Sequence, residues 1–274
     1  MTQTIVVKLG GSILRRLHPT FYSRCAELQR KGVTPIIVHG GGPMISEWMK
    51  ATGKAPKFVD GLRVTDEETL AIVEMVLAGS VNKQIVTCFL SEGADAVGLS
   101  GIDLQLLQTE QRNPVLGYVG EVISVNDKAI RQLLDQGWIP VISSLGIDDR
   151  GQHLNINADE AASAIARAVG AKQLVMVSDV DGISIGEGDD KHILSQATPE
   201  LIEQYIHSGE ITGGMIPKVR SGIRCLEGSV EEVWIVNGEK PDSLMLDSAN
   251  RDCGTCLVKK EAEKDVALSH ISSS

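Results

Sequence analysis

Residues 4–11 read Thr-Ile-Val-Val-Lys-Leu-Gly-Gly, an apolar run that ends in a lysine and two glycines. Such a run of β-branched residues bounded by glycine is typical of a buried strand. A second run, at residues 35–42, reads Pro-Ile-Ile-Val-His-Gly-Gly-Gly. Because an amphipathic segment separates the two runs, they predict a strand–helix–strand unit with parallel strands.

The same alternation continues along the chain. Six apolar runs predict strands, at residues 4–9, 35–39, 94–99, 138–143, 174–178 and 233–236. Apolar residues spaced three and four apart predict eight helices, at residues 21–29, 45–51, 67–77, 81–90, 129–134, 160–169, 200–207 and 219–226. We therefore expect an α/β fold with a mainly parallel sheet and helices on both faces.

Composition narrows the class of protein. Hydrophobic residues make up 42% of the 274 residues and aromatic residues only 3%, so we expect an aliphatic core. The net charge is −10, which argues against a nucleic-acid partner. We find no signal peptide and no apolar run as long as the roughly 18 residues of a membrane span, and we expect a cytoplasmic protein.

The five cysteines are scattered, as expected in a reducing compartment. Cys253 and Cys256 form an isolated C-x-x-C pair, and no further pair at zinc-site spacing follows it. We expect two thiols at a strand edge and no metal ligands. Residues 259–274 are charged and then serine-rich, which predicts a mobile tail.

Glycine clusters follow the first two predicted strands. Glycine lets the backbone approach an anion closely, with N–H groups directed at it. Gly10 and Gly11 follow the first strand, and Gly40, Gly41 and Gly42 follow the second. One Gly-Gly pair is more often a tight turn. Two clusters at the carboxyl edge of neighbouring parallel strands predict a shared anion site, because ligands of such sheets bind at that edge.

The familiar phosphate and hydrolase motifs are absent. The sequence contains no G-x-x-x-x-G-K-[ST], no G-x-G-x-x-G, no H-R-D with D-F-G, no H-E-x-x-H and no G-x-S-x-G. P-loop proteins, dinucleotide-binding proteins of the usual fingerprint, protein kinases, zinc proteases of that motif and α/β-hydrolases are therefore excluded.

Four charged residues are candidates for chemistry. Lys8 lies at the carboxyl end of the first strand, and Lys218 lies at the start of a helix, where a cation opposes the helix dipole unless an anion offsets it. Asp159 falls in a first helical turn behind the predicted N-cap Asn157, which by itself is ordinary dipole chemistry. Arg63 has a fork suited to a carboxylate, although in isolation a surface arginine is the simpler interpretation.

Six motifs in this order resemble the amino acid kinase family over residues 5–258. They are K-L-G-G (8–11), H-G-G-G (39–42), G-L-R-V-T (61–65), N-I-N-A-D (155–159), S-D-V-D-G (178–182) and G-G-M-I-P-K (213–218). The resemblance implies an open, mainly parallel αβα sandwich with two lobes. Residues 1–170 would bind the acceptor and dimerise, and residues 171–258 would bind ATP with Mg²⁺.

The resemblance also assigns site residues. It implies catalytic roles for Lys8 and Lys218, organised by Asp159. The acceptor site would comprise Gly41, Gly42, Arg63 and Asn155. The nucleotide site would comprise Gly10, Gly11, Asp179, Val180, Asp181, Gly182, Ile183, Ser184, Glu210, Ile211 and Thr212. No protein ligand to a metal is expected.

Within the family, the motifs are most similar to those of members that phosphorylate the γ-carboxylate of N-acetyl-L-glutamate. That reaction gives N-acetyl-L-glutamyl 5-phosphate and ADP, the second step of arginine biosynthesis. A carboxylate with a pKa near 4.3 is ionised at pH 7, which explains why no general base is evident. Two alternatives stay open: a kinase for carrier-linked aminoadipate, and a non-catalytic amino-acid sensor on the same fold.

The resemblance also bears on assembly. Arginine-inhibited family members carry a helix ahead of the first strand, and here that strand begins by about Thr4. We therefore expect a homodimer that arginine does not inhibit strongly. Control by a PII-type regulator is left open.

Overall fold

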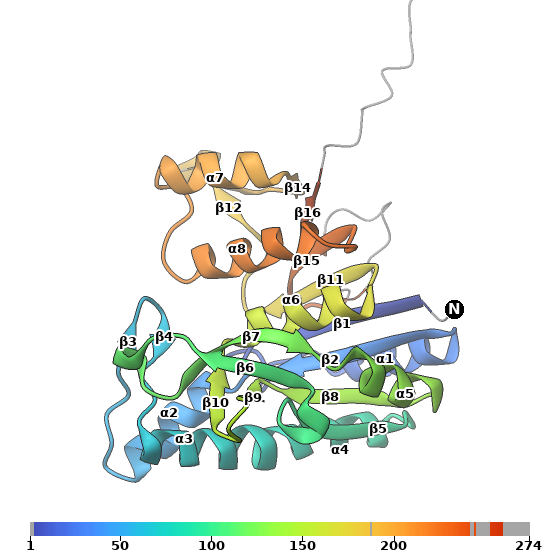
Figure 1. The fold of residues 1–274 in the computed structure, drawn as a ribbon. Coiled ribbons are helices and arrows are strands. Elements are labelled where there is room, and N and C mark those ends of the chain that lie inside the picture. Colours follow the sequence, from blue (N-terminus) through green and yellow to red (C-terminus); the bar gives the residue numbers. More distant parts are fainter. Residues whose placement is uncertain (1–2, 187, 242–243, 245–252, 260–274) are drawn as a thin grey trace, which may run out of the picture.

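The computed structural model describes residues 3–186, 188–241, 244 and 253–259. Eight strands form its main sheet, in the spatial order β14 (Gln196–Ala197), β16 (Gly254–Val258), β15 (Glu232–Asn237), β11 (Gln173–Ser178), β1 (Gln3–Leu9), β2 (Val33–His39), β8 (Ile139–Ser143) and β5 (Ala96–Ser100). The six strands from β15 to β5 are the six predicted ones, and all are parallel. The predicted mainly parallel sheet is confirmed (Figure 1).

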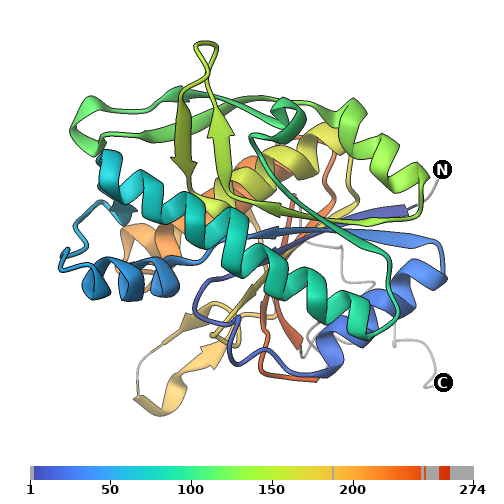
Figure 2. The same ribbon diagram turned by 90° about the horizontal axis from the view of Figure 1, so that it is seen from below.

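Helices cover both faces of this sheet (Figures 1 and 2). One face carries α1 (Thr20–Arg30), α2 (Gly42–Ala51), α3 (Glu67–Glu74) and α4 (Asn82–Ser91). The other carries α5 (Asp127–Asp135), α6 (Ala158–Val169) and α8 (Met215–Leu226), with α7 (Pro199–His207) packed beside α8. Along β1, Val7 belongs to the first core and Val6 to the second, as strand alternation requires. The molecule is therefore an αβα sandwich.

The prediction of two separate helices at 67–77 and 81–90 is wrong. A π-helical segment, η1 (Met75–Val81), joins α3 to α4, so the helix runs without a break from Glu67 to Ser91 (Figure 2). Gly79 and Ser80 suggest a break in the sequence. The helix continues because the apolar residues on both sides of them are buried against the sheet, namely Val73, Leu77, Val81, Ile85 and Phe89.

This continuous helix has the length of a membrane span, although Glu74 and Lys83 interrupt its apolar residues, so it contains no uninterrupted apolar run of about 18 residues. By length and composition alone, Glu67–Ser91 would suffice to cross a membrane, and half of its most apolar stretch is buried inside the protein. Its contacts with β5 and β8 account for that composition, because an apolar stripe is what a core-facing helix needs.

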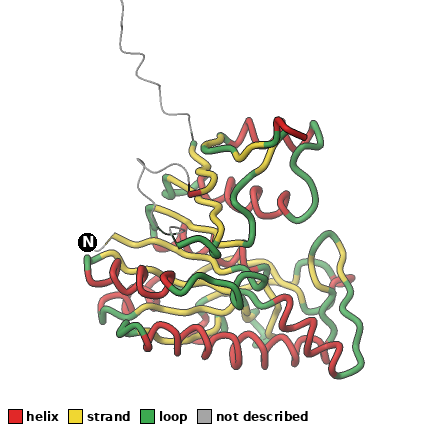
Figure 3. Tube along the Cα trace, turned by 180° about the vertical axis from the view of Figure 1, so that it is seen from behind, coloured by secondary structure: helices red, strands yellow, loops and turns green. Residues whose placement is uncertain are grey.

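Several further strands escaped the sequence analysis. Four of them pair into a small closed barrel: β6 (Leu107–Gln111), β7 (Val119–Val125), β9 (Leu145–Ile147) and β10 (His153–Ile156). Two hairpins pair β3 (Phe58–Val59) with β4 (Leu62–Arg63), and β12 (Ser184–Ile185) with β13 (His192–Ile193). Three 3-10 turns complete the described elements: η2 (Asp103–Gln105), η3 (Pro114–Leu116) and η4 (Gly188–Asp190). Figure 3 colours the strands yellow and the loops that connect the elements green.

The C-terminal part differs from expectation at one point. Cys256 is buried in β16, which lies between β14 and β15. It therefore belongs to an interior strand and not to a sheet edge. Of the predicted tail, only Lys259 belongs to the described part of the chain, and residues 260–274 lie outside it.

The register of the sheet brings the carboxyl ends of its central strands level with one another. Leu9 pairs with His39 on one side and with Val177 on the other. His39 in turn pairs with Ser143. The loops that follow β1, β2, β8 and β11 therefore emerge at the same edge, and the candidate site lies there.

Candidate active site

The two predicted glycine loops touch each other at this edge. A Cβ atom added to Gly11 would lie 2.7 Å from Gly42 N and 3.0 Å from Gly41 Cα. A Cβ atom on Gly41 would lie 2.7 Å from Leu77 Cδ2 in η1. Real Cβ atoms do not approach other atoms so closely, so only glycine permits this contact between the loops. The prediction that both clusters converge on one crevice is confirmed.

Lys8 and Asp159 form an ion pair in the crevice. Lys8 Nζ lies 2.8 Å from Asp159 Oδ1, with the side chains only 8% and 16% exposed. Asp159 is positioned by the start of α6, where Asn157 is the N-cap and its Oδ1 accepts from the Asp159 and Glu160 N–H groups. The predicted N-cap is therefore confirmed, and the helix start aims Asp159 at the end of β1.

Lys218 approaches the same group from the first turn of α8. Its Nζ lies 3.4 Å from Ser178 Oγ, at the end of β11. Burial and the charge of Lys8 lower the pKa of Lys218, and Asp159 and Asp179 partly offset that effect. Burial acts to raise the pKa of Asp159, but the charges of Lys8 and Lys218 outweigh it and hold that pKa below its usual range. The buried Lys8 and the half-buried Lys218 thus share one carboxylate, which favours an added anion.

On one side of this group lies a cavity of about 210 Å³. Its lining includes Lys8, Asp159 and all four predicted acceptor residues, namely Gly41, Gly42, Arg63 and Asn155. Phe58, Leu62, Leu77 and Ser144 also line it, and the sequence analysis did not identify them. They come from the β3–β4 hairpin, η1 and the loop after β8, whose places are set by tertiary packing.

Arg63 is not a surface arginine. It is 7% exposed, and its guanidinium donates to Gly42 O and Ser46 Oγ, each at 2.9 Å. It also lies over the Phe58 ring, 4.8 Å from the centroid. Among the described residues no carboxylate lies within ion-pair distance of it. Burial lowers the pKa of Arg63. A buried cation without a carboxylate partner is costly, so the cavity it lines is suited to an anion.

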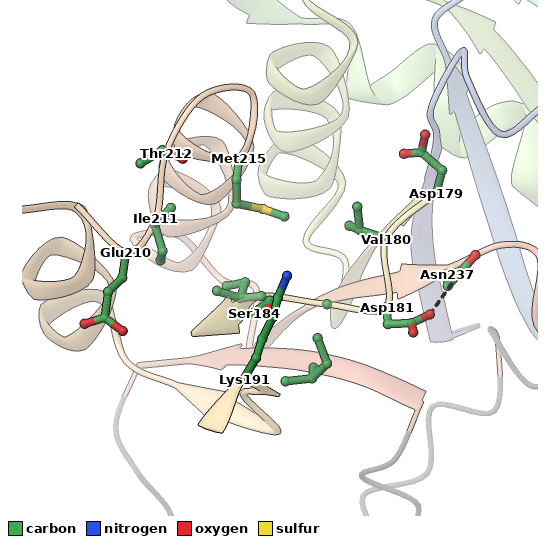
Figure 4. A pocket seen from close by; sticks show the side chains of 13 residues that line it. Asp179, Val180, Asp181, Ser184, Lys191, Glu210, Ile211, Thr212, Met215 and Asn237 are labelled. Atoms are coloured by element: carbon green, nitrogen blue, oxygen red, sulfur yellow. Dashed lines mark hydrogen bonds between the residues drawn. The ribbon is translucent and has the colours of Figure 1, made fainter. Parts of the chain in front are cut away.

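A second cavity, of about 480 Å³, opens among β11, the β12–β13 hairpin and the start of α8 (Figure 4). Nine of the predicted nucleotide residues line it: Asp179, Val180, Asp181, Gly182, Ile183, Ser184, Glu210, Ile211 and Thr212. Lys191, Ile193, Met215 and Asn237 join them without having been predicted. The structure thus brings two distant sequence segments, 179–184 and 210–212, into one pocket.

The loop of residues 179–184, which lines this second cavity, is held by hydrogen bonds to Thr255 and Asn237. Ile183 N donates to Thr255 Oγ1 at 2.8 Å, and a Cβ atom on Gly182 would lie 2.6 Å from the same oxygen. Gly182 has φ +144°, which favours glycine. Asn237 donates to Asp181 Oδ1 at 2.7 Å, the dashed line in Figure 4, and this bond together with Lys240 lowers the pKa of Asp181.

Gly10 and Gly11 directly follow β1, next to Lys8. Gly11 lines the smaller cavity beside Lys8. Gly10 is not among the lining residues of either cavity, and its N–H donates to Val177 O at 3.0 Å. Its described role is therefore to turn the chain tightly after β1, since a Cβ atom there would lie 3.2 Å from Val177 O.

The carboxylates nearest the two lysines already have cationic partners. Among the described residues, no three His, Cys, Asp or Glu side chains gather so that they could hold one. Asp159 is engaged by Lys8 and Asp179 by Arg16, at 3.3 Å. The site fits an ion that arrives on nucleotide phosphates and keeps most of its water, as Mg²⁺ commonly does.

Comparison with known proteins agrees with this geometry. A family model described as "Amino acid kinase family" matches residues 3–237. The acetylglutamate kinase of Geobacillus kaustophilus (strain HTA426) is 47% identical over 240 residues, covering 87% of this chain and 92% of that relative.

Two solved structures are also similar. The structure of smu.665 from Streptococcus mutans UA159 is 30% identical, with a TM-score of 0.84 and coverage of 95% of this chain and 100% of that chain. The N-acetylglutamate synthase from Neisseria gonorrhoeae, complexed with coenzyme A and N-acetyl-glutamate, is 25% identical, with a TM-score of 0.81 and coverage of 95% and 60%. With the family model spanning most of its length and close relatives matched nearly end to end, the chain belongs to the amino acid kinase family.

Proposed function

We propose that this enzyme transfers the γ-phosphoryl group of ATP to the γ-carboxylate of N-acetyl-L-glutamate, giving N-acetyl-L-glutamyl 5-phosphate and ADP. The observation that carries the proposal is the group of Lys8, Asp159 and Lys218 beside two cavities. Lys8 and Asp159 line the smaller cavity, and Lys218 approaches Ser178, the neighbour of Asp179 in the lining of the larger one. Each cavity is lined by residues expected for one substrate. The 47% identity to a named acetylglutamate kinase supports the same acceptor. The reaction is a step of arginine biosynthesis.

The chemistry needs charge neutralisation and no general base. The acceptor carboxylate is already ionised at pH 7 and has to approach a polyanionic phosphate. Lys8 and Lys218 would offset that repulsion and stabilise the charge that develops on the transferring oxygens. Asp159 would hold the two ammonium groups in place, because both interact with its carboxylate.

The remaining residues would bind and orient the two substrates. Gly41 and Gly42 would offer backbone N–H groups to the acceptor, Arg63 a guanidinium fork to a carboxylate, and Asn155 an amide. Residues 179–184 and 210–212 would hold the nucleotide, with Gly10 and Gly11 shaping the turn after β1. We place the acceptor lobe at residues 1–170 and the ATP lobe at 171–258.

Mg²⁺ would accompany the nucleotide and supply neutralisation of its phosphate charge when bound. We propose no direct protein ligand for it, because the carboxylates nearest the lysines already have cationic partners. The ion would be held by phosphate oxygens and water.

We further propose a cytoplasmic homodimer without nucleic-acid or membrane partners. The net charge of −10 supports the absence of nucleic acid. Met75 and Leu90, exposed by 63% and 55% on the long helix, support a face that a second copy covers. Light scattering would give the mass of two chains, and a monomeric mass at micromolar concentration would overturn the dimer.

Acceptor specificity tests the proposal directly. ADP release would be measured with ATP, Mg²⁺ and a panel of acceptors: N-acetyl-L-glutamate, glutamate, aspartate, carbamate and carrier-linked aminoadipate. N-acetyl-L-glutamate should give by far the highest kcat/KM. If aminoadipate on its carrier protein were preferred, the assignment of the acceptor would fail.

The two alternatives are not favoured. A kinase for carrier-linked aminoadipate would require a different acceptor preference from that of the named relatives. A sensor without activity has no need for paired lysines, yet Lys8 and Lys218 both interact with Asp159 here. The absence of any ATP consumption with any acid in the panel would support the sensor.

A further inference from the structure

A buried histidine lies directly behind the H-G-G-G loop. His39 is the last residue of β2 and is fully buried. Its Nδ1 lies 3.1 Å from Gly40 O, and its Nε2 lies 3.1 Å from Asn82 Nδ2 at the start of α4. His39 does not line either cavity, so it can act on a substrate only through the loop.

The partners of Asn82 fix the orientation of its side-chain amide. Asn82 Nδ2 lies 2.8 Å from Val141 O and 3.1 Å from Leu99 O, and both of these carbonyls can only accept. Its Oδ1 lies 3.1 Å from Lys83 Nζ, which can only donate. The nitrogen of Asn82 therefore faces His39. Its two hydrogens serve three neighbouring acceptor atoms, so one hydrogen is shared between two of them. Because an amide nitrogen accepts no hydrogen bond, His39 Nε2 is the acceptor in this contact.

The tautomer of His39 follows from this chain of contacts. With Nε2 as an acceptor, the proton of a neutral ring is on Nδ1, which then donates to Gly40 O. Burial lowers the pKa of His39 to about 4, and the Lys83 charge acts in the same direction, so the ring is neutral at pH 7. In a doubly protonated ring, Nε2–H and the Asn82 Nδ2 amide would be two donors facing each other without an acceptor, which is unfavourable.

The orientation of Gly40 O determines the orientation of the Gly41 N–H group, because both belong to the same peptide. The peptide between Gly40 and Gly41 is planar and trans, so its N–H points opposite to its C=O. Glycines at 40, 41 and 42 leave this peptide few steric limits of its own. Within the described residues Gly41 N–H has no acceptor, and Gly41 lines the smaller cavity. The loop therefore offers a donor that an anion in the cavity could accept from, on a backbone whose conformation its own glycines restrict little.

We propose that His39, held as its Nδ1–H tautomer by Asn82, is a positioning residue that locks the Gly40–Gly41 peptide and presents the Gly41 N–H to the reacting anion. The identity of that anion rests on the proposed function, whereas the tautomer and the lock do not. Preorganised donors stabilise transition-state charge because they need no reorientation during the reaction.

The first test measures the tautomer without any substrate. Nitrogen-15 NMR of the imidazole rings at pH 7 should show His39 with a protonated Nδ1 and an unprotonated Nε2. The chain has six histidines, and the spectrum of His39→Asn identifies the signal by its loss. An Nε2–H tautomer, or a doubly protonated ring, would overturn the proposal whatever the enzyme phosphorylates.

The second test uses a matched pair of variants. The amide nitrogen of His39→Asn can take the place of Nδ1 and donate to Gly40 O, whereas His39→Gln carries its amide where Nε2 lies. His39→Gln should lower kcat/KM for N-acetyl-L-glutamate by about tenfold or more, with KM for ATP unchanged. His39→Asn should stay within about threefold of the parent enzyme.

A control variant makes the same chemical change elsewhere. His207 Nδ1 lies 2.7 Å from Glu203 O on the exposed face of α7, so His207→Gln should leave activity unchanged. Thermal unfolding of all three variants would identify a loss that is only due to unfolding. Equal losses in folded His39→Asn and His39→Gln would contradict the lock. If the parent enzyme did not phosphorylate N-acetyl-L-glutamate, the proposed function would fail, and the NMR result would still decide the tautomer.

Discussion

The central residues of the site are two lysines that share one carboxylate. Lys8 contacts Asp159 at 2.8 Å, and Lys218 interacts with both of them while also approaching Ser178. The two lysines and the aspartate together therefore carry one net positive charge. An incoming phosphoryl group would supply the missing negative charge, which is why these residues matter more for the transition state than for stability.

Removal of the Lys218 ammonium should therefore act on turnover. Lys218→Met is expected to lower kcat by more than about tenfold, since one donor to developing charge commonly supplies 2.7–4 kcal/mol. Steady-state kinetics in both substrates would measure it. Arg220→Met removes an exposed charge two residues further along α8 and should have little effect. A Lys218→Met enzyme with the parent kcat would contradict the transition-state role.

Arg63 should act on acceptor binding. Arg63→Lys keeps the charge but loses the planar fork, so KM for N-acetyl-L-glutamate should rise by about tenfold, and KM for ATP should not change. Arg15→Lys is the matched control, because Arg15 also makes a forked contact, with Glu47, but on the exposed surface. A parental KM for the acceptor in Arg63→Lys would show that the fork does not bind it.

At this scale the sequence predicted the charged residues and not their surroundings. The sequence alone identifies Lys8, Asp159 and Arg63 as candidates, because each lies close to a glycine or an N-cap at the end of a strand. The sequence does not identify Phe58, which lies under Arg63, or Leu77, which lies against Gly41. Both contacts join segments whose spacing along the chain follows no recognisable pattern. The sequence shows His39 only as part of a glycine motif, because its hydrogen-bond partner Asn82 lies 43 residues away.

At the scale of elements, the site depends on how closely two loops and one helix approach. The loop after β1 contacts the loop after β2, and side chains of η1 pack against the loop after β2. The π-helical segment matters here because it carries Leu77 and Val81, which lie against Gly41, in the middle of an otherwise regular helix. Such segments are often found at functional sites.

A methyl group between the two loops should separate them. Gly11→Ala places its Cβ atom against backbone atoms of Gly42 and Gly41, so we expect a loss of about 1–3 kcal/mol in the free energy of unfolding and a lower kcat/KM for the acceptor. Urea unfolding and kinetics would measure the two effects. Gly79→Ala has open space around it within η1 and should keep the stability or increase it. Comparable destabilisation in both variants would contradict the close contact.

The elements themselves were predictable in proportion to their periodicity. The six long strands and the amphipathic helices carry period-two or three-to-four patterns, and all six strands lie where the patterns place them. The strands β9 and β10 have only three and four residues, and β6 and β7 mix polar residues or glycine into their apolar positions, so none of the four has a comparable pattern. The unbroken helix from Glu67 to Ser91 was missed because Gly79 and Ser80 usually interrupt a helix, and only its packing on the sheet shows otherwise.

At the scale of the whole molecule, one buried group links the site to stability. Burial lowers the pKa of His39 from 6.5 to about 4. Between those values the unfolded chain binds a proton that the folded chain does not. The free energy of unfolding should therefore fall as the pH is lowered through this window, by up to about 3 kcal/mol from this histidine.

His39→Asn should remove that share of the acid sensitivity. Urea midpoints would be compared at pH 7.5 and pH 4.5 for the parent chain and for the variant, and the difference between the two pH values should be smaller in the variant. His207→Gln should keep the parental dependence, because His207 is exposed. An identical pH dependence in the His39 variant would mean that this histidine is not held neutral by burial.

The sheet also joins the two halves of the molecule. β1 pairs with β11, so the strand that carries Lys8 is hydrogen-bonded to the strand that leads to residues 179–184. Lys218 reaches this edge from α8, which packs on α6 next to Asp159. The group of Lys8, Lys218 and Asp159 is thus assembled from elements far apart in the sequence, and this arrangement supports phosphoryl transfer to a carboxylate.

The most direct measurement is the trapping of the acyl phosphate. With ATP, Mg²⁺, N-acetyl-L-glutamate and hydroxylamine, the enzyme should form N-acetylglutamyl hydroxamate in step with ADP, and Lys218→Met should form more than about tenfold less. ADP release without hydroxamate, or hydroxamate that does not depend on N-acetyl-L-glutamate, would contradict transfer to this carboxylate.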